Sequence, residues 1–221
     1  MLKLHTFADT NNPNSLSNRM RAKRFKFFKK LAAPLPKPLS IIDVGGTPQF
    51  WELCGWANRD DIHITLVNLK ASECKYSNIE IRIGDAMNLA DYSDQSFDIA
   101  FSNSVIEHLF TYANQASMAR EIQRVGHAYW VQTPNYWFPI EPHFQTLGWQ
   151  WLPMALRVAV IRKHTCGSRG PYPDLEQARK SVREVRLMSR REFSQLFPGA
   201  NIRAERFCGL VKSWIAFGGF P

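Results

Sequence analysis

At 221 residues the chain is long enough for one domain with a substantial core and too short for two independent ones. Its four cysteines form no CxxC pair and are too sparse for a disulfide scaffold, which predicts reduced thiols in a reducing compartment. The opening MLKLHTFADTNNPN turns polar after four residues, and no run approaches the roughly 18 apolar residues of a membrane span. These features predict a cytoplasmic protein.

The formal net charge of +9 is unevenly distributed. Residues 1–40 carry nine Lys/Arg against one acid, residues 41–156 carry six against thirteen, and residues 157–221 carry thirteen against five. An acidic middle between two basic ends fits an anionic partner or surface, and it equally fits solvated charged faces.

Residues 15–36, SLSNRMRAKRFKFFKKLAAPLP, predict a helix that is capped by Ser15 or Ser17 and stopped by prolines. Seven Lys/Arg between positions 19 and 30 flank a crude apolar face. Such a helix could lie on anionic lipid, cover an active site, or pack on a sheet with a solvated basic face. We define residues 1–38 as a basic N-terminal helical extension and residues 39–221 as the main domain.

In four segments, a run of apolar, β-prone residues ends in polar residues or glycine: LSIIDVGG (39–46), IHITLVNL (62–69), IEIRIGDA (79–86) and SFDIAFSNS (96–104). Nearly continuous apolar centres predict strands covered on both faces. A fifth strand, HAYWVQTPN, follows a helix predicted from Thr111 to Val125, with Gly126 as the C′ residue. This alternation predicts an α/β fold with a doubly wound, mostly parallel sheet.

The C-terminal part predicts a helix over residues 188–199, with Ser189 as cap, Glu192 completing a capping box, and Pro198-Gly199 as the stop. NIRAERF (201–207) and KSWIAFG (212–218) then predict an antiparallel pair at the end of the sheet. With the five earlier strands, this pair makes the expected sheet seven-stranded.

Residues 135–188 form an insert that far exceeds the minimal length of a crossover. We interpret it as a substrate lid, and the alternative is an extra helical layer without a ligand. The aromatic residues expected to line an acceptor pocket are Tyr136, Trp137, Phe138 and Trp149.

The stretch DVGGT at residues 43–47 ends a predicted strand in two glycines and precedes a helix-like PQFWELCGW. In open α/β sheets, ligands bind beyond the carboxyl ends of the strands, where a glycine loop lets the backbone approach them. The fingerprint GxGxxG is absent, which disfavours a nicotinamide or flavin site. Polar residues at successive strand ends predict one ligand site along this edge.

DVGGT, the GDA at 84–86 and FDIAFSNSVIEHL at 97–109 resemble the class I S-adenosylmethionine-dependent methyltransferases of the small-molecule type. The resemblance covers residues 40 to 135 and the terminal hairpin, and it implies a Rossmann-like fold with S-adenosylmethionine as cofactor. It places the glycine motif at the methionine portion, Asn68 at the ribose, and Asp85 with Ala86 at the adenine. The cofactor-binding residues expected are Asp43, Gly45, Gly46, Thr47, Asn68, Asp85, Ala86, Ser102 and Asn103.

Two departures separate the chain from that family's pattern. The usual DxGxGxG is shortened to DVGGTPQ, so that only the first glycine aligns comfortably. Asn68 stands where the family has an acid, and loss of the charge-assisted hydrogen bond should weaken the ribose contact by about 1 kcal/mol.

Methyl transfer from a sulfonium is an in-line displacement, and an acceptor that carries a proton benefits from a nearby base. His108, after the fourth strand, and His143, in the insert, are the candidate catalytic bases. The pair Glu107-His108 is similar to metal-dependent relatives that carry a second glutamate three residues earlier. Ser104 holds that position here, so no metal is expected.

The resulting hypothesis is a methyltransferase acting on an oxygen or nitrogen of a small-molecule acceptor, which could be a lipid-linked compound or a natural product. An RNA methyltransferase is an alternative because of the basic ends, but no recognised RNA-binding module is present, so nucleic acid is not expected. A non-catalytic cofactor-binding partner protein is the other alternative. Peripheral membrane contact through the N-terminal helix stays open, and the sequence does not identify the acceptor or the oligomeric state.

Overall fold

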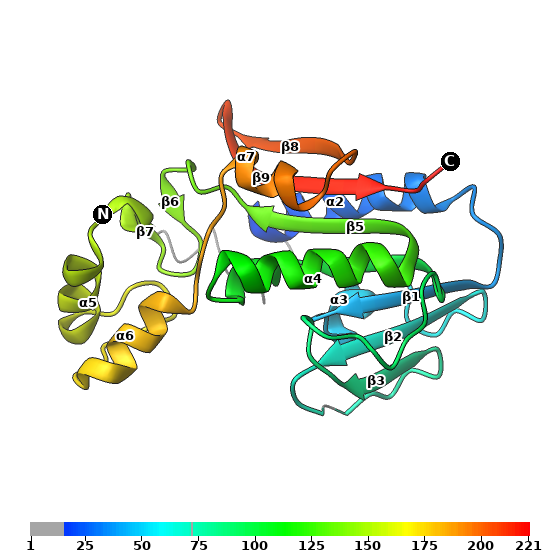
Figure 1. Cartoon of the computed structure of the whole chain (residues 1–221), viewed down its shortest axis with the longest axis horizontal. Coiled ribbons are helices and arrows are strands. Elements are labelled where there is room, and N and C mark those ends of the chain that lie inside the picture. The colour runs from blue at the N-terminus through cyan, green and yellow to red at the C-terminus, as the bar shows by residue number, and fades with distance from the viewer. Residues whose placement is uncertain (1–15, 72) are drawn as a thin grey trace.

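The computed structural model describes residues 16–71 and 73–221. Within these residues, the centre is a seven-stranded sheet in the order β3-β2-β1-β4-β5-β9-β8 (Figure 1). The first five strands pair in parallel, while β9 runs antiparallel to both β5 and β8. The strands are β1 (Leu39–Val44), β2 (Ile62–Asn68), β3 (Ile79–Ile83), β4 (Phe97–Asn103), β5 (Gly126–Pro134), β8 (Asn201–Phe207) and β9 (Leu210–Gly218). The predicted mostly parallel sheet with an antiparallel end is confirmed.

Helices cover both faces of the sheet, and α4 lies on the near side of it in Figure 1. Consecutive residues of β1 belong to different cores: Ile41 packs with residues of α2 and α3, and Ile42 packs with residues of α4 and α7. The helices are α2 (Leu16–Ala32), α3 (Pro48–Leu53), α4 (Tyr112–Val125), α5 (Met154–Lys163), α6 (Leu175–Arg183) and α7 (Arg190–Leu196), with 3-10 turns at Ile106–His108 and Trp149–Trp151.

Helix α2 packs its aromatic side chains into the main core. Phe25 and Phe28 are buried, and the Phe28 ring lies 4.9 Å from that of Phe101 and 5.4 Å from that of Trp130. Helix α2 therefore packs on the sheet, which is one of the three interpretations of residues 15–36, and its aromatic face is covered by protein. The proposed cap Ser15 lies outside the described residues.

Two strand features differ from the expectations. β3 is an edge strand with Glu80 and Arg82 exposed, so it is not covered on both faces as its apolar centre suggested. Gly126 does not end α4 in a left-handed turn, because its φ of −105° is extended and β5 begins there directly. A Cβ at Gly126 would lie 2.7 Å from the backbone nitrogen of Ala100, so close approach of β4 explains the glycine.

The C-terminal elements follow the sequence closely. Ser189 caps α7, and Glu192 completes the capping box. The hairpin between β8 and β9 turns at Cys208 and Gly209, which both have positive φ, as a tight two-residue hairpin requires. β9 therefore begins at Leu210, two residues earlier than expected.

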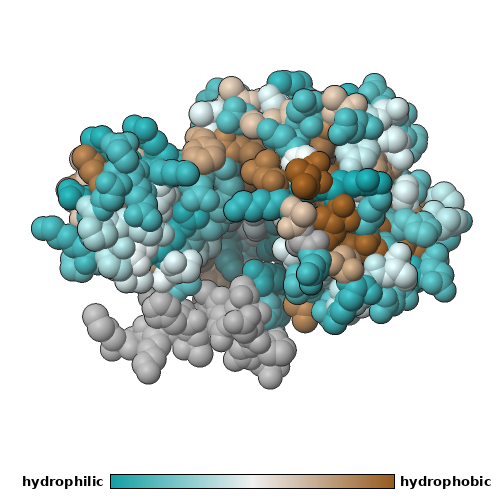
Figure 2. All heavy atoms as spheres, turned by 90° about the horizontal axis from the view of Figure 1, so that it is seen from below, coloured by the Kyte–Doolittle hydropathy of each residue, from teal (hydrophilic) through white to brown (hydrophobic). Residues whose placement is uncertain are grey.

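The insert contains a short hairpin, β6 (Ile140–Glu141) and β7 (Thr146–Leu147), followed by α5 and α6. It has a small core of its own, with Phe144, Trp149 and Ile161 almost fully buried. Figure 1 shows α5 and α6 projecting from the sheet, and Figure 2 shows their lobe as a largely hydrophilic body set off by a hollow. The insert thus forms a helical lobe with a core of its own, and such a lobe is compatible with both a substrate lid and an extra helical layer.

No helix in the described ranges combines the length and apolar character that crossing a bilayer requires.

We predict that Gly126→Ala lowers the free energy of unfolding by about 3 kcal/mol, because its Cβ collides with the β4 backbone. Gly55→Ala is the matched control: its Cβ would meet nothing within 4 Å, and it should cost only about 1 kcal/mol from its positive φ. Urea denaturation of the two variants measures both values. Equal losses would contradict the close-approach explanation.

Candidate active site

A cavity of about 580 Å³ opens at the carboxyl ends of β1 to β4, within the size range of small-molecule sites. Four loops supply its walls, one after each of these parallel strands. We call it the strand-end cavity, and it is lined by Gly45, Gly46, Thr47, Pro48, Asn68, Leu69, Asp85, Ala86, Ser104, Val105, His108 and Leu109, among others.

The glycine turn after β1 is tightly constrained. Gly45 has a φ of +82°, and a Cβ on Gly46 would lie 1.6 Å from Oδ2 of Asp43. Asp43 is 1% exposed and accepts a hydrogen bond from Trp51 Nε1 at 2.8 Å. Burial raises the pKa of Asp43 to about 7, although the Trp51 bond opposes the shift. Asp43 therefore supports the turn from beneath and does not line the cavity.

The hydrogen bond that Asn68 donates explains why an amide stands where the family pattern has an acid. Its Nδ2 donates to the carbonyl oxygen of Gly46 at 2.7 Å, a bond that a carboxylate cannot make. Among the described residues, no hydrogen bond uses Oδ1 of Asn68, which leaves an acceptor beside the cavity. The amide thus ties β2 to the glycine turn.

The structure brings six of the nine predicted cofactor residues together in the strand-end cavity. The other three are engaged elsewhere: Asp43 beneath the turn, Ser102 donating to Val44 O at 3.0 Å, and Asn103 accepting from Arg24 at 2.6 Å. Alternate residues of a strand point to opposite faces, so a position at a strand end does not guarantee a place in the cavity. The six are Gly45, Gly46, Thr47, Asn68, Asp85 and Ala86.

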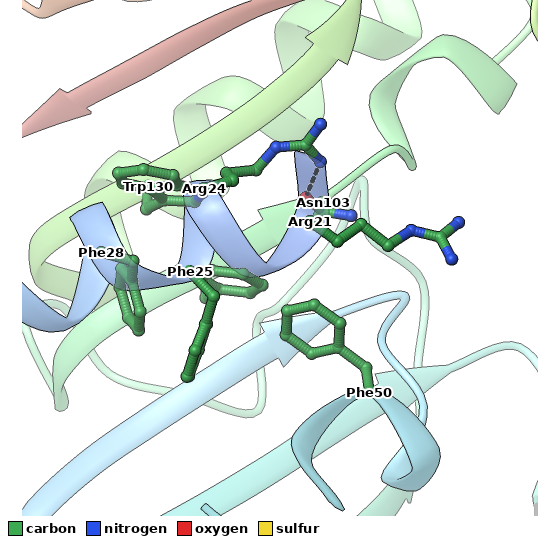
Figure 3. A pocket seen from close by; sticks show the side chains of 8 residues that line it. Arg21, Arg24, Phe25, Phe28, Phe50, Asn103 and Trp130 are labelled. Atoms are coloured by element: carbon green, nitrogen blue, oxygen red, sulfur yellow. Dashed lines mark hydrogen bonds between the residues drawn. The ribbon is translucent and has the colours of Figure 1, made fainter. Parts of the chain in front are cut away.

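Arg24 is an important residue that sequence reasoning missed. It pairs with Glu205 at 2.7 Å, and its Nη1 donates to Asn103 and Gln132 at 2.6 and 2.8 Å. Figure 3 shows Arg24 reaching from α2 toward Asn103, while the Arg21 side chain extends away from the aromatic cluster. One guanidinium therefore holds α2 against the ends of β4 and β5 and against β8.

His108 and His143 lie side by side although 35 positions separate them in the sequence. Their ring centroids are 4.7 Å apart, and Nε2 of His143 is 4.0 Å from Oε1 of Glu107. Glu107 is fully buried and accepts a hydrogen bond from Thr133 at 3.1 Å. Burial raises the pKa of Glu107 to about 7, and the charge of His143 opposes that rise.

The two histidines differ in basicity. Burial, and then the neighbouring His143, lower the pKa of His108 to about 4. Burial also disfavours charge on His143, but its Nδ1 lies 2.6 Å from Glu141, and this carboxylate together with that of Glu107 leaves the pKa of His143 raised. Because Glu141 accepts the Nδ1 proton, the lone pair of neutral His143 is on Nε2, which lies toward Glu107.

Glu107, His108 and His143 each offer a ligand atom, and these atoms lie within 4.8 Å of one another. Two histidines and a carboxylate form a donor set that divalent metal ions use. The expectation that no metal binds considered only Glu107 and His108. It could not include His143, because the insert's folding alone brings that residue here.

The four predicted acceptor aromatics separate into different environments. Tyr136 and Trp149 line a second cavity of about 430 Å³, the insert cavity, together with Glu141. Phe138 lines a third cavity, of about 110 Å³. Trp137 is 63% exposed and does not line any of these cavities.

Comparisons with known proteins agree with this architecture. Residues 52–128 match the family described as methyltransferase domain, a segment that begins just after the glycine turn. Uncharacterized proteins of Mycobacterium tuberculosis strains CDC 1551 / Oshkosh and H37Rv are 40% identical over 52 residues, which is 24% of this chain. The match spans only 18% of the length of these relatives.

Solved structures share the fold at low identity. A carbon methyltransferase, CurJ, aligns with a TM-score of 0.59 and 10% identity, covering 97% of this chain and 56% of that one. Protein PH0226 of Pyrococcus horikoshii OT3 aligns with a TM-score of 0.54 and 15% identity, covering 96% of this chain and 93% of that one. An S-adenosylmethionine-dependent methyltransferase of Aquifex aeolicus aligns with a TM-score of 0.51 and 11% identity, covering 97% of this chain and 95% of that one.

The domain match lies on a sheet of the methyltransferase order, and the strand-end cavity occupies the position where such folds bind their ligands. Residues 52–128 of the chain thus match the methyltransferase-domain family, and they lie in a fold that an S-adenosylmethionine-dependent methyltransferase shares.

Proposed function

We propose that the protein transfers the methyl group of S-adenosylmethionine to an oxygen or nitrogen of a small-molecule acceptor. One observation carries this proposal: His108 lines the strand-end cavity and contacts His143, so the cofactor site adjoins a group that can accept a proton. An acceptor O–H or N–H loses a proton during methylation, and such a proton needs a base. A base at this place supports an acceptor atom that loses a proton when it is methylated, as a hydroxyl oxygen or an N–H nitrogen does.

The strand-end cavity would hold the cofactor along three loops. The backbone of Gly45 and Gly46 would lie against the methionine portion, Oδ1 of Asn68 would accept from a ribose hydroxyl, and Asp85 with Ala86 would lie at the adenine. The cofactor supplies an activated methyl group. The protein's part is to align the acceptor with it, and positioning contributes up to about 7–11 kcal/mol in favourable cases.

In the proposed reaction, the bound cofactor would supply its methyl carbon to the acceptor lone pair, and the electron pair of the broken carbon–sulfur bond would stay on sulfur. The acceptor's proton passes to Nε2 of His143. Glu141 holds the imidazole in the required tautomer and stabilises the imidazolium that forms. His108 stays neutral because burial lowers its pKa to about 4, so it adds no second positive charge beside a sulfonium.

The insert supplies the proposed acceptor walls. Tyr136 and Trp149 line the insert cavity, and Phe138 lines the smaller third cavity. Glu141 connects these walls to the reaction, since it lines the insert cavity and hydrogen-bonds His143. Aromatic walls of this kind exclude water from an acceptor and suit an apolar ring or chain.

We expect Asp85→Ala to raise the dissociation constant for S-adenosylmethionine about 10-fold, because it removes a carboxylate from the adenine end of the cavity. Isothermal titration calorimetry measures the change, and circular dichroism checks the fold. Asp91→Ala removes an exposed carboxylate of the following loop and should leave affinity unchanged. If the wild type binds the cofactor and Asp85→Ala has the same dissociation constant, the adenine lies elsewhere. If the wild type does not bind S-adenosylmethionine even at millimolar concentration, the proposed function is refuted.

Restoring the family's acid at position 68 should weaken cofactor binding. Asn68→Asp replaces the amide donor by an oxygen that repels the Gly46 carbonyl, so the glycine turn loses its tie to β2. We expect at least a 3-fold higher dissociation constant for S-adenosylhomocysteine, the demethylated product, by calorimetry. Tighter binding would show that the ribose contact outweighs the Gly46 bond.

His143→Gln should lower kcat by about 10²- to 10⁴-fold with cofactor affinity unchanged. In wild type, kcat should rise with pH through the raised pKa of His143, above its ordinary value of about 6.5, because only the neutral imidazole accepts a proton. Turnover of a labelled methyl group measured across pH 5–9 tests this. A pH profile that persists in His143→Gln would exclude His143 as the base, and activity abolished by EDTA would assign the cluster to a metal instead.

A further inference from the structure

The third cavity, of about 110 Å³, adjoins the strand-end cavity and carries an unusual concentration of positive charge. Arg21, Arg24 and Lys212 line it, from α2 and β9. Ser104 lines both this cavity and the strand-end cavity, so the two share a wall. Pro142, which also lines it, directly precedes His143. We call it the cationic cavity.

One carboxylate serves these three cations. Glu205 forms a 2.7 Å ion pair with Arg24, whose side chain is only 10% exposed. In residues 16–71 and 73–221, no ion pair within 4 Å involves Arg21 or Lys212: Arg21 hydrogen-bonds the amide of Asn18 at 3.1 Å, and Lys212 lies 3.5 Å from the sulfur of Met20. Two half-buried cations thus border one cavity without a carboxylate of their own.

The electrostatics of Arg21 and Lys212 are those of a site that would be stabilised by an anion. Burial and then the charge of Arg24 lower the pKa of both groups, and for Lys212 the Glu205 carboxylate opposes that effect. Half-buried cations that repel one another store unfavourable energy, and a bound carboxylate or phosphate relieves it through charge-assisted hydrogen bonds.

We propose that the cationic cavity binds an anionic group of the methyl acceptor, a carboxylate or a phosphate, through Arg21 and Lys212. This assignment rests on the proposed function, and it specifies the substrate class. The anionic group anchors the acceptor on the α2 side of the shared wall at Ser104, and the rest of the molecule reaches the methyl group past His143. Phe138, which also lines the cavity, contacts the apolar body next to the anionic group.

The geometry favours a small anion over a nucleic-acid backbone. A cavity of about 110 Å³ accommodates one carboxylate or phosphate and little more. Backbone binding uses cations arrayed along an open surface and repeated at phosphate spacing. Arg21 and Lys212 instead line one small cavity from two different elements.

Calorimetry with the full chain, saturated with S-adenosylhomocysteine, tests the assignment with three probes: benzoate, phenyl phosphate and the neutral benzamide. We expect benzoate or phenyl phosphate to bind at least 10-fold more tightly than benzamide, and the stronger of the two identifies the anionic group. Arg21→Met and Lys212→Met should each weaken that binding about 10-fold. Lys163→Met, which removes an exposed cation of α5, is the matched control and should change nothing.

Each remaining outcome overturns the assignment. Equal binding of charged and neutral probes, or anion binding unaffected in both variants, excludes an anion site at Arg21 and Lys212. A 20-nucleotide RNA that binds more tightly than either anion, and is weakened by the same variants, assigns the cations to nucleic acid. S-adenosylhomocysteine affinity is measured in every variant, because its retention separates failure of this site from failure of the methyltransferase function.

Discussion

The Arg24 guanidinium is the interaction on which the arrangement of the site depends. A buried cation is costly unless its donors are satisfied, and Arg24 meets Glu205, Asn103 and Gln132 in one place. These partners come from β8, β4 and β5, so the bond network fixes α2 across the carboxyl end of the sheet. The aromatic residues of α2 then complete the core beneath it, and Arg21 comes to border the cationic cavity.

A second set of contacts fixes the glycine turn after β1. Asp43 fills the space that a side chain at position 46 would need, and Asn68 holds the Gly46 carbonyl from the neighbouring strand. Gly46 is therefore required by the protein's own packing, and Gly45 by its φ of +82°, before any ligand binds. The same packing leaves their backbone exposed to the strand-end cavity, so one structural requirement produces both the turn and the binding surface.

The sequence was sufficient for the elements governed by local rules. The strands and the mostly parallel class of the sheet followed from alternating apolar runs, and the capping box at Ser189 and Glu192 was correct because a cap is a contact between residues three positions apart. The resemblance at residues 97–109 located the strand-end cavity. Position alone, however, could not tell that Ser102 and Asn103 bond to Val44 and Arg24, since that depends on which face each side chain takes.

Contacts between distant segments could not be predicted. Arg24 looked like one of seven basic residues on a helix, and nothing local distinguishes it from those that face water. His143 was a candidate, but its pairing with Glu141 and its approach to Glu107 exist only after the insert has folded. Gly126 followed a helix as a C′ glycine would, and the spacing of β4 to β5 decided its role instead.

The insert has a core that is separate from the core of the sheet, so the two parts of the protein can differ in stability. Phe144, Trp149 and Ile161 stabilise α5 and α6 without contributing to the sheet, whereas the strand-end cavity is lined from the sheet, the loops that follow its strands and the start of α3. Regions with their own packing can open without global unfolding. In the function proposed above, the sheet and its loops would bind the nucleotide, whereas His143 and the aromatic acceptor walls would lie in a lobe that can open without unfolding the sheet.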